Sequence, residues 1–399
     1  MNPLTNLKRI YFIGIGGIGM SALARYFNTQ GVKVSGYDKT PTALTQSLEE
    51  EGIAIHFEDD LNQMDKEATV IVYTPAIPTE HKELNYYRDN GYLVVKRSDV
   101  LQWVTENAFT IGIAGTHGKT TTTSMTAHIL RHTGYGCNAF LGGIASNYDT
   151  NFWSHEKNVV VVEADEYDRS FLTLYPQAAV VTSTDADHLD IYGAAEQVLE
   201  SFQLFVDQIK PGGFFIQKAG LNLKGPADSK TFGIEQGDYQ AKNIRIENHR
   251  MVFDMLYPGG SISDIPMRIP GFHNIENALA AAALAMYHGL TAEEVKAGIA
   301  SFKGVKRRFE YHVETPEHVL IDDYAHHPTE ITACLKSVKA LYPNEKLVAV
   351  FQPHLFSRTR DFLADFGESL GLADEIYLLD IYPARELPIP GIDSNLLLE

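Results

Sequence analysis

The chain has 399 residues, 44% of them hydrophobic, and a formal net charge of −18 at pH 7. Domains usually contain roughly 100–200 residues, so this length predicts two to four of them with sizeable cores. The negative charge argues against a general binder of nucleic acids or acidic membranes, although local basic groups could still bind anionic ligands.

The first segment, residues 1–106, begins with patterns that predict a strand, a helix and a strand, at residues 9–13, 20–30 and 32–38. The turn after the first strand reads G-x-G-x-x-G through Gly14, Gly16 and Gly19. Asp38 follows 19 residues after the last of these glycines, a spacing typical of a dinucleotide fold whose acid binds a ribose hydroxyl. The same turn suits any diphosphate at a helix N-terminus, including that of a nucleotide sugar. A plain tight turn is a third interpretation.

The second segment, residues 107–305, opens with a predicted phosphate-binding loop. It lies between an expected strand and an expected helix, at residues 109–114 and 122–132. Glycine lets the N–H groups of such a loop crowd an anion, and the helix N-terminus adds partial positive charge. Lys119 would reach the outer phosphates of a nucleoside triphosphate, and the Thr120 hydroxyl would hold Mg²⁺. The general pattern G-x-x-x-x-G-K-[ST] requires glycine where this chain has Ile113, so the loop is of a variant kind.

Acidic residues follow the next two expected strands, at residues 158–162 and 178–184. Ligands of open α/β sheets bind at the carboxyl ends of the strands. Glu163 is therefore a candidate Mg²⁺ ligand, with a solvated acidic loop as the plainer interpretation. His188 is crowded by acids and could bind a metal, although a single histidine is usually structural. A helix expected at residues 273–287 begins with Asn274 and Asn277, which could cap it or face a purine.

The third segment, residues 306–399, predicts a second and smaller α/β pattern. Its expected strands and helix lie at residues 319–324, 347–351 and 329–342. His326 and His327 follow the first strand, and Arg358 follows the second. Histidine and arginine at strand ends could bind a carboxylate or a phosphate. The plainer interpretation is a solvated cluster at the start of an exposed helix.

Targeting and redox features favour a soluble cytoplasmic protein. Cys137 and Cys334 form neither a disulfide framework nor a C-x-x-C metal pair, which fits a reducing compartment. Residues 1–9 lack the apolar core of a signal peptide. No apolar run approaches the roughly 18 residues of a membrane helix, so we expect no membrane insertion. We also expect no nucleic-acid partner.

Taken together, these motifs resemble those of the Mur ligases of peptidoglycan synthesis. The resemblance covers nearly the whole chain and rests on residues 14–21, 115–123, 163–166, 187–188, 273–279, 305–309, 322–328 and 351–354. The family's phosphate loop is similar to G-T-x-G-K-[ST], which accounts for Ile113. Within the family, residues 16–21 are most similar to the members that attach the first amino acid, L-alanine.

The resemblance implies a three-domain α/β fold. Residues 1–106 would form a Rossmann-like domain for the UDP-sugar, 107–305 a central parallel-sheet domain for ATP, and 306–399 a Rossmann-like domain for the amino acid. The dinucleotide interpretation of the first segment is then set aside, although Asp38 could still contact the uridine or ribose. Relatives run further than residue 399, so we expect the third domain to be incomplete.

The reaction that the resemblance implies is ATP-dependent amide formation in peptidoglycan precursor synthesis. The lactyl carboxylate of UDP-N-acetylmuramate would take the γ-phosphoryl group, giving an acyl phosphate and ADP. The amine of L-alanine would then displace phosphate. The implied cofactors are ATP and Mg²⁺, the implied partners are the two substrates, and the protein is expected to be a monomer or homodimer.

By position, the resemblance assigns roles to residues of all three segments. The catalytic residues would be Lys119, His188, Arg308 and His327. ATP would contact Gly115, Thr116, His117, Gly118, Lys119, Thr120, Thr121, Asn274, Asn277, Arg308 and Asp323. The UDP-sugar or alanine would contact Gly16, Gly17, Gly19, Met20, Ser21, Asp38, Thr74, His326 and Arg358. Mg²⁺ would be held by Thr120, Glu163 and His188.

Three alternatives stay open beside this hypothesis. A nicotinamide-dependent oxidoreductase would use the N-terminal glycine turn but leave the phosphate loop and the third segment without a role. A non-enzymatic ATP-dependent switch would not need the histidines and arginines of the third segment. A related ligase would add another amino acid or a ready-made peptide.

Overall fold

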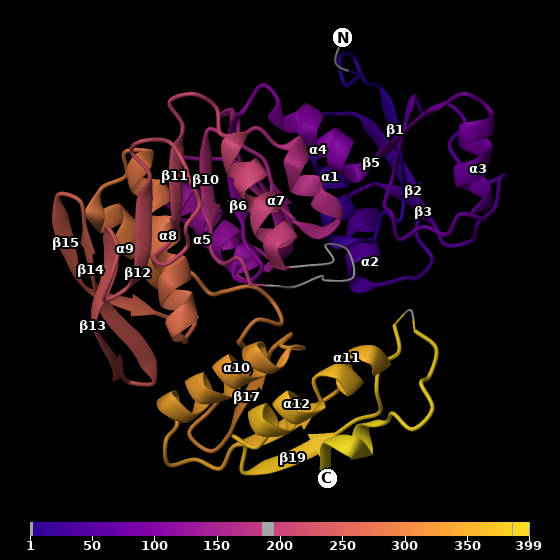
Figure 1. The fold of residues 1–399 in the computed structure, drawn as a ribbon. Coiled ribbons are helices and arrows are strands. Elements are labelled where there is room, and N and C mark those ends of the chain that lie inside the picture. The colour runs from indigo at the N-terminus through magenta and orange to yellow at the C-terminus, as the bar shows by residue number, and fades with distance from the viewer. Residues whose placement is uncertain (1–2, 186–194, 385, 399) are drawn as a thin grey trace.

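The N-terminal unit, indigo in Figure 1, is a parallel five-stranded sheet in the order β3-β2-β1-β4-β5. The computed structural model describes residues 3–185, 195–384 and 386–398. The strands of this unit are β1 (Arg9–Ile13), β2 (Lys33–Tyr37), β3 (Ala54–His56), β4 (Val70–Tyr73) and β5 (Leu93–Lys96). Its helices are α1 (Ile18–Thr29), α2 (Ala43–Glu50), α3 (Lys82–Asp89) and α4 (Arg97–Thr105).

Strand β1 lies at the centre of this sheet because its side chains are apolar on both faces. Ile10 and Phe12 belong to one core, and Tyr11 and Ile13 belong to a second core that includes Tyr87 of α3. The strand order reverses at β1, which places the carboxyl ends of β1 and β4 at a switch point. Ligands of open α/β sheets bind at such a point.

The central unit is a ten-stranded sheet in the order β15-β14-β13-β12-β11-β10-β6-β9-β7-β8. The strands from β13 to β7 run parallel, whereas β8, β14 and β15 pair antiparallel. The strands are β6 (Phe109–Ala114), β7 (Asn138–Ala145), β8 (Thr150–Trp153), β9 (Val159–Glu163), β10 (Ala178–Val181), β11 (Phe214–Lys218), β12 (Lys230–Ile234), β13 (Tyr239–Glu247), β14 (Arg250–Tyr257) and β15 (Gly260–Met267). The helices are α5 (Lys119–His132), η1 (Tyr167–Thr173), α7 (Ala195–Asp207), α8 (Phe272–Tyr287) and α9 (Ala292–Ser301).

Helices α5 and α8 pack against each other, and α8 also contacts β11, β12 and β13. Residues 278–285 of α8 are alanine and leucine and are fully buried. Small side chains let two helices approach closely. This packing brings the N-terminus of α5 next to that of α8.

The N-terminal and central units meet where α1 packs on β7 and β8. A polar network crosses this contact, in which Arg25 donates to Asn151 and to Glu51. The Asn151 side chain donates in turn to Oγ of Ser21 at 2.8 Å. Arg25 and Asn151 are only 5% and 0% exposed. Losing either partner would therefore leave a buried polar group unpaired, which is costly.

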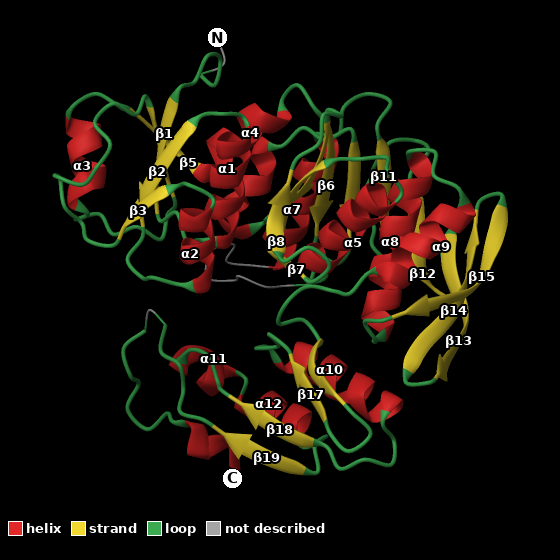
Figure 2. Ribbon diagram, turned by 180° about the vertical axis from the view of Figure 1, so that it is seen from behind, coloured by secondary structure: helices red, strands yellow, loops and turns green. Residues whose placement is uncertain are grey.

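The C-terminal unit, orange to yellow in Figure 1, lies beneath the other two in that view. Figure 2 shows the same arrangement from behind, with β13, β14 and β15 at the end of the molecule away from the N-terminal unit. The strands of the C-terminal unit are an antiparallel pair, β16 (Glu310–Glu314) and β17 (Val319–Asp322), and a parallel pair, β18 (Val348–Phe351) and β19 (Glu375–Leu378). Its helices are α10 (Pro328–Leu341), α11 (Phe356–Asp361), α12 (Leu363–Leu370) and η2 (Ser394–Leu398).

The elements expected around the glycine turn and the phosphate loop are present. The helix expected at residues 122–132 begins earlier, at Lys119, because the end of the phosphate loop is already helical. The strand expected at 178–184 ends at Val181. Strands β3, β7, β8, β12 to β16 and β19 were not predicted. In the part of the chain that the structure describes, no helix is long and apolar enough to cross a membrane.

Candidate active site

A cavity of about 400 Å³ lies between the central and C-terminal units. Its walls are the phosphate loop, the first turn of α8, the connection at residues 304–309 and the first turns of α10. The predicted site residues in its lining are Thr116, His117, Gly118, Lys119, Thr120, Thr121, Asn274, Asn277, Arg308, Asp323 and His326. Residues from two sequence segments therefore meet around one space.

Gly118 turns the phosphate loop into α5. Its φ is +83°, and a Cβ there would lie 2.6 Å from Oδ1 of Asn277 on α8. Gly115 has a φ of +134°, and a Cβ there would lie 2.0 Å from Oγ1 of Thr182 at the end of β10. A side chain at either position would strain the backbone and collide with a neighbour. Ile113, where the general pattern has glycine, is instead a buried residue of β6.

Lys119 is held at the loop by two carbonyl oxygens and by the carboxylate of Glu166. Its Nζ donates to the carbonyl oxygens of Gly115 at 2.7 Å and of Thr116 at 3.3 Å. It also lies 2.7 Å from Oε2 of Glu166, whose side chain is only 3% exposed. Burial raises the pKa of Glu166, whereas the charge of Lys119 lowers it. The ammonium group thus has a fixed position at the phosphate loop.

Glu163, at the carboxyl end of β9, lies beside Thr120 and could hold Mg²⁺ with it. The Glu163 carboxylate accepts the N–H of Gly142 at 3.0 Å. Burial raises its pKa, while Lys119, Arg308 and a hydrogen bond with Thr120 lower it. A buried carboxylate next to a hydroxyl offers the hard oxygen ligands that Mg²⁺ prefers. The residues described at this position therefore fit the predicted metal.

Asn274 and Asn277 form a chain of hydrogen bonds at the start of α8. Asn277 Nδ2 donates to Oδ1 of Asn274 at 3.2 Å, and Asn274 Nδ2 donates to the carbonyl oxygen of Pro270 at 2.6 Å. The Thr122 hydroxyl of α5 donates to Oδ1 of Asn277 at 3.1 Å. The N-cap of α8 is Gly271, with no side-chain cap hydrogen bond. Capping of α8 by these asparagines is therefore wrong as an interpretation, and they link α8 to α5 instead.

Arg308 and Asp323 form the wall of the cavity at the connection to the C-terminal unit. Arg308 Nη2 donates to Oγ1 of Thr120 at 3.3 Å. The Asp323 carboxylate accepts the N–H groups of Phe309 and Ala325, each at 2.8 Å. Burial raises the pKa of Asp323, although these two hydrogen bonds lower it. Arg308 therefore links the connection to Thr120 of the phosphate loop, and Asp323 fixes the backbone of the connection next to the cavity.

Glu330 of α10 reaches the phosphate loop from the C-terminal unit. Its carboxylate accepts the N–H groups of His326 at 3.1 Å and of His327 at 3.3 Å. Its Oε1 lies 3.7 Å from Nδ1 of His117. Burial would raise the pKa of Glu330, but a hydrogen bond with His117 and the charge of His326 lower it to about 2. Glu330 is therefore ionised at neutral pH.

Comparisons with known proteins agree with this architecture. Three family models match, described as the Mur ligase family catalytic domain at residues 9–108, the Mur ligase middle domain at 113–285 and the Mur ligase glutamate ligase domain at 307–396. The chain belongs to the Mur ligase family. This result confirms the predicted family, and the three-domain α/β fold is confirmed with it.

Individual relatives resemble this Mur ligase over most of its length. It is 51% identical over 406 residues to the UDP-N-acetylmuramate–L-alanine ligase of Phocaeicola vulgatus, covering 99% of the chain and 89% of that protein. The structure of UDP-N-acetylmuramate-alanine ligase from Thermotoga maritima matches with a TM-score of 0.84 and 30% identity. This match covers 94% of the present chain and 86% of the Thermotoga chain. The structure of UDP-N-acetylmuramate:L-alanyl-gamma-D-glutamyl-meso-diaminopimelate ligase from Neisseria meningitides matches with a TM-score of 0.68 and 28% identity. This match covers 75% of the present chain and 100% of the Neisseria chain.

The N-terminal glycine turn of this Mur ligase lies at the switch point of its sheet. A Cβ on Gly14 would lie 3.2 Å from Cγ2 of Thr74, which follows β4. Asp38 Oδ2 accepts the N–H of Gly16 at 2.8 Å, so this acid supports the turn itself. The N–H of Gly17 donates to the carbonyl oxygen of Gly14 at 3.2 Å. The turn, Asp38 and Thr74 thus lie together, and their contact with a shared ligand stays a prediction.

Three other predicted substrate contacts lie on α1. Met20 is 2% exposed and Ser21 is 0% exposed. The Ser21 hydroxyl donates to the carbonyl oxygen of Ile18 at 3.0 Å and accepts from Asn151. A Cβ on Gly19 would lie 2.9 Å from Nη1 of Arg97. The Met20 and Ser21 side chains therefore serve the packing of α1, and a substrate contact there would have to use the backbone.

Among the described residues predicted for the ATP, metal or amino-acid site, those that do not line the cavity are Gly115, Glu163, His327 and Arg358. His327 is the N-cap of α10, where its ring accepts the N–H of Thr329 at 3.4 Å and lies edge-on to Phe362. Arg358 lies on α11, and its Nη1 is buried with no hydrogen-bond partner among the described residues. His188 lies outside the described residues. The roles assigned to these residues stay predictions.

Sequence reasoning missed several charged residues of the site. Lys218 of β11 and Glu276 of α8 line the cavity and form an ion pair at 2.7 Å. Glu166 and Glu330 are the partners of Lys119 and His117. Glu166 and Glu276 stand inside motifs that carried the family resemblance, so their position was a usable signal. No signal in the sequence pointed to Lys218, because it lies on a strand without a recognised motif.

Proposed function

We propose that this Mur ligase joins L-alanine to the lactyl carboxylate of UDP-N-acetylmuramate and converts ATP to ADP and phosphate. The observation that carries the proposal is the near-full-length similarity to the Phocaeicola vulgatus alanine ligase, which is much higher than that to the peptide ligase. The cavity supports it, because a phosphate loop there faces polar groups of a second unit. An oxidoreductase would leave these groups without a role.

In this proposal the phosphate loop and Lys119 bind the β- and γ-phosphates of ATP. The loop offers backbone N–H groups at a helix N-terminus, and the ammonium is already fixed at the loop by Glu166. Phosphoryl transfer depends mainly on positioning and charge neutralisation. Arg308, which reaches Thr120, adds a second positive charge. These groups stabilise charge on the phosphoryl group while it is transferred.

Mg²⁺ is proposed as the metal cofactor, held by Thr120 and Glu163 with His188 as a further ligand. When bound, the ion neutralises phosphate charge during transfer. Glu163 suits this role because its carboxylate is desolvated and already oriented by the N–H of Gly142.

The proposed chemistry proceeds in two displacements. A lactyl carboxylate oxygen attacks the γ-phosphorus, the bond to the β-phosphate oxygen breaks, and ADP leaves. The amine of L-alanine then attacks the acyl carbon, phosphate leaves, and the amine loses a proton. His326 lines the cavity and, with Arg358, is proposed to contact the alanine.

We assign residues 1–106 to the UDP-sugar, 107–305 to ATP and 306–399 to the amino acid. The glycine turn, Asp38 and Thr74 support the first assignment, because they lie together at a switch point. We further propose a cytoplasmic monomer or homodimer. Two free cysteines, one of them buried, fit a reducing compartment.

The test supplies UDP-N-acetylmuramate and ATP·Mg²⁺ with L-alanine, glycine, L-serine or the tripeptide L-alanyl-γ-D-glutamyl-meso-diaminopimelate, and measures phosphate release. We expect release that requires the sugar and is fastest with L-alanine. Release with the tripeptide and not with L-alanine would instead favour a peptide ligase. Saturable binding of NADH, measured by its fluorescence, would favour the oxidoreductase.

A further inference from the structure

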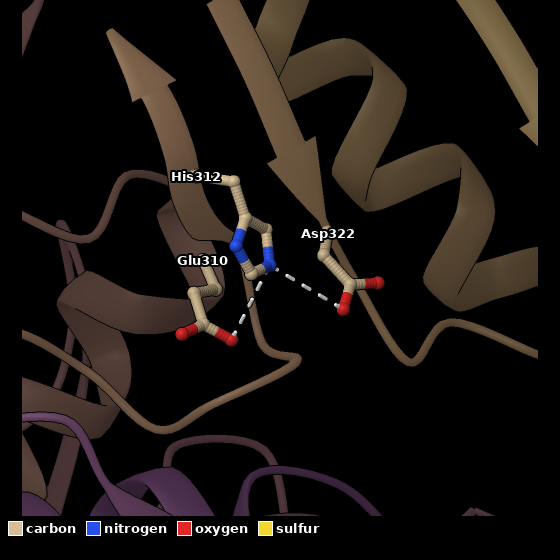
Figure 3. A group of neighbouring side chains, drawn as sticks. All are labelled: Glu310, His312 and Asp322. Carbon is tan, nitrogen blue, oxygen red and sulfur yellow. Dashed lines mark ion pairs between the residues drawn. The ribbon is translucent and has the colours of Figure 1, made fainter. Parts of the chain in front are cut away.

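The hairpin of β16 and β17 carries three potential metal ligands outside the cavity. Glu310 and His312 lie on β16, and Asp322 is the last residue of β17. One ligand atom from each lies within 4.8 Å of the other two. Figure 3 shows the His312 ring between the two carboxylates.

The pairing of the two strands explains why these side chains meet. Glu310 pairs directly with Asp322, so both project from the same face of the hairpin. The register shifts between Tyr311 and Val313, which makes His312 the extra residue of a β-bulge. A bulge redirects a side chain and is common next to functional sites. Here the extra residue is His312, whose Nε2 lies close to both acids.

The distances are close to those of a coordinated ion. Nε2 of His312 lies 3.8 Å from Oε2 of Glu310 and 3.7 Å from Oδ2 of Asp322. Ligand atoms bound tetrahedrally to zinc at about 2.0–2.1 Å lie about 3.4 Å apart. Small rotations of three side chains would therefore bring them to a common ion. The exposed face of His312 leaves room for water as a fourth ligand, since the side chain is 48% exposed.

The surroundings orient one ligand and supply one competitor. The N–H of Arg307 donates to Oε2 of Glu310 at 2.8 Å, the kind of outer contact that fixes a metal-binding carboxylate. The Arg307 guanidinium lies 4.0 Å from Asp322 and competes for the same charge. Its side chain is 65% exposed and can turn into solvent when an ion arrives.

We propose that Glu310, His312 and Asp322 bind one Zn²⁺ ion. One imidazole and two carboxylates suit zinc, whereas Mg²⁺ prefers oxygen ligands in an octahedron. The ion would fix the β16–β17 hairpin at the connection between the central and C-terminal units. Asp323, the next residue along the chain, lines the cavity, so the site adjoins the proposed active site without sharing a ligand with it. The proposal does not depend on the proposed function.

The test titrates the whole protein with Zn²⁺ against a chromophoric zinc indicator, in an excess of Mg²⁺ that fills the proposed Mg²⁺ site. The variants are His312→Ala, Asp322→Asn and the matched control His318→Ala, which removes an exposed histidine from the same hairpin. We expect the wild type and the control each to bind one Zn²⁺ ion per chain tightly. Even loss of an outer partner lowers metal affinity roughly 10–100-fold, so His312→Ala should weaken it by at least about tenfold.

Spectroscopy supplies a second readout. Loading the protein with Co²⁺ in place of Zn²⁺ should give visible absorption bands that His312→Ala removes and His318→Ala keeps. Equal Zn²⁺ affinity in the wild type and in His312→Ala would overturn the proposal. Thermal unfolding without metal checks that each variant folds. If His312→Ala proves unstable, Asp322→Asn carries the test, and unchanged zinc affinity there would also reject the site.

Discussion

Lys119 has a fixed position at the phosphate loop. Two loop carbonyls and the buried Glu166 fix its ammonium group. Groups that are already oriented stabilise charge in a transition state without a cost of reorganisation. Lys119 is therefore expected to contribute to the rate of phosphoryl transfer more than to substrate binding.

Replacing Lys119 with alanine should lower kcat for ligation by about 10²–10³-fold or more, since it removes a fixed charge from the transferring group. Phosphate release measures the rate, and calorimetry measures UDP-N-acetylmuramate affinity. That affinity should stay close to wild type, because the sugar is assigned to the N-terminal unit. Lys224→Ala, at an exposed position, is the matched control. Loss of sugar binding in a folded Lys119→Ala variant would contradict the assignment.

Gly118 and Gly134 separate two effects of glycine in this protein. Both have positive φ, +83° and +76°, but only Gly118 has a neighbour within 4 Å of an added Cβ. Gly134→Ala should cost about 1 kcal/mol in the free energy of unfolding, from backbone strain alone. Gly118→Ala should cost about 1–3 kcal/mol and also weaken ATP binding, because Asn277 must move. Urea unfolding and nucleotide titration measure the two quantities, and equal effects of both variants would show that the contact with Asn277 is unimportant.

At the scale of elements, α5 is a polar helix in a buried position. Threonines 120–123 are 7% exposed or less. His128 is 2% exposed, and its ring nitrogens hydrogen-bond to the hydroxyls of Tyr148 and Ser301, each at 2.9 Å. A helix with so many polar residues depends on its packing between α8, α9 and β7 rather than on an apolar stripe.

The buried His128 should make stability depend on pH. Burial, with His132 nearby, lowers its pKa from 6.5 to about 4. Between these values the unfolded chain binds more protons, so this contribution is complete above pH 6.5 and is lost as pH falls toward about 4. The loss is about 3.5 kcal/mol at most, at roughly 1.4 kcal/mol per pKa unit. Urea unfolding across this range should show a shallower pH dependence for His128→Gln, and identical slopes would refute the assignment.

Two of the strands that sequence reasoning missed, β13 and β15, share a physical cause. β13 and β15 expose side chains along much of their length, with buried positions at irregular intervals. Such strands carry no continuous apolar run and no clean alternation. Central strands such as β6 and β9 are buried almost throughout, and their unbroken apolar runs were recognisable.

At the scale of the whole molecule, Glu330 connects two units across the cavity. It caps α10 through the backbone of His326 and His327 and approaches His117 of the phosphate loop. This contact joins the phosphate loop of the central unit to the C-terminal unit. The contact is between residues far apart in sequence, so it exists only in the folded arrangement.

Glu330→Gln should therefore raise the apparent KM for ATP about fivefold, equivalent to about 1 kcal/mol for one partly exposed charge pair. Since the pKa of Glu330 is about 2, its carboxylate should stay ionised across the working pH range. Glu345→Gln, an exposed change in the same unit, is the control. Steady-state kinetics decides, and an unchanged KM with lower thermal stability would show that Glu330 serves only the cap of α10.

The sequence by itself determined the family, the α/β class and the identity of the phosphate loop. These properties depend on local order, because a strand, a glycine turn and a helix N-terminus are neighbours in the chain. Lys119, Thr120 and Glu163 could be proposed for that reason, as could the glycine turn near Asp38.

Only the tertiary structure decided which side chains face one another. Glu166 and Glu330 as partners of the phosphate loop, and Lys218 as part of the cavity, come from elements separated by 47 or more residues in their closest contacts. Met20 and Ser21 are predicted ligand contacts, but both side chains are buried, and that of Ser21 accepts a hydrogen bond from Asn151 of the central unit. Contacts across such separations depend on how sheets and helices pack. Local sequence patterns do not predict them.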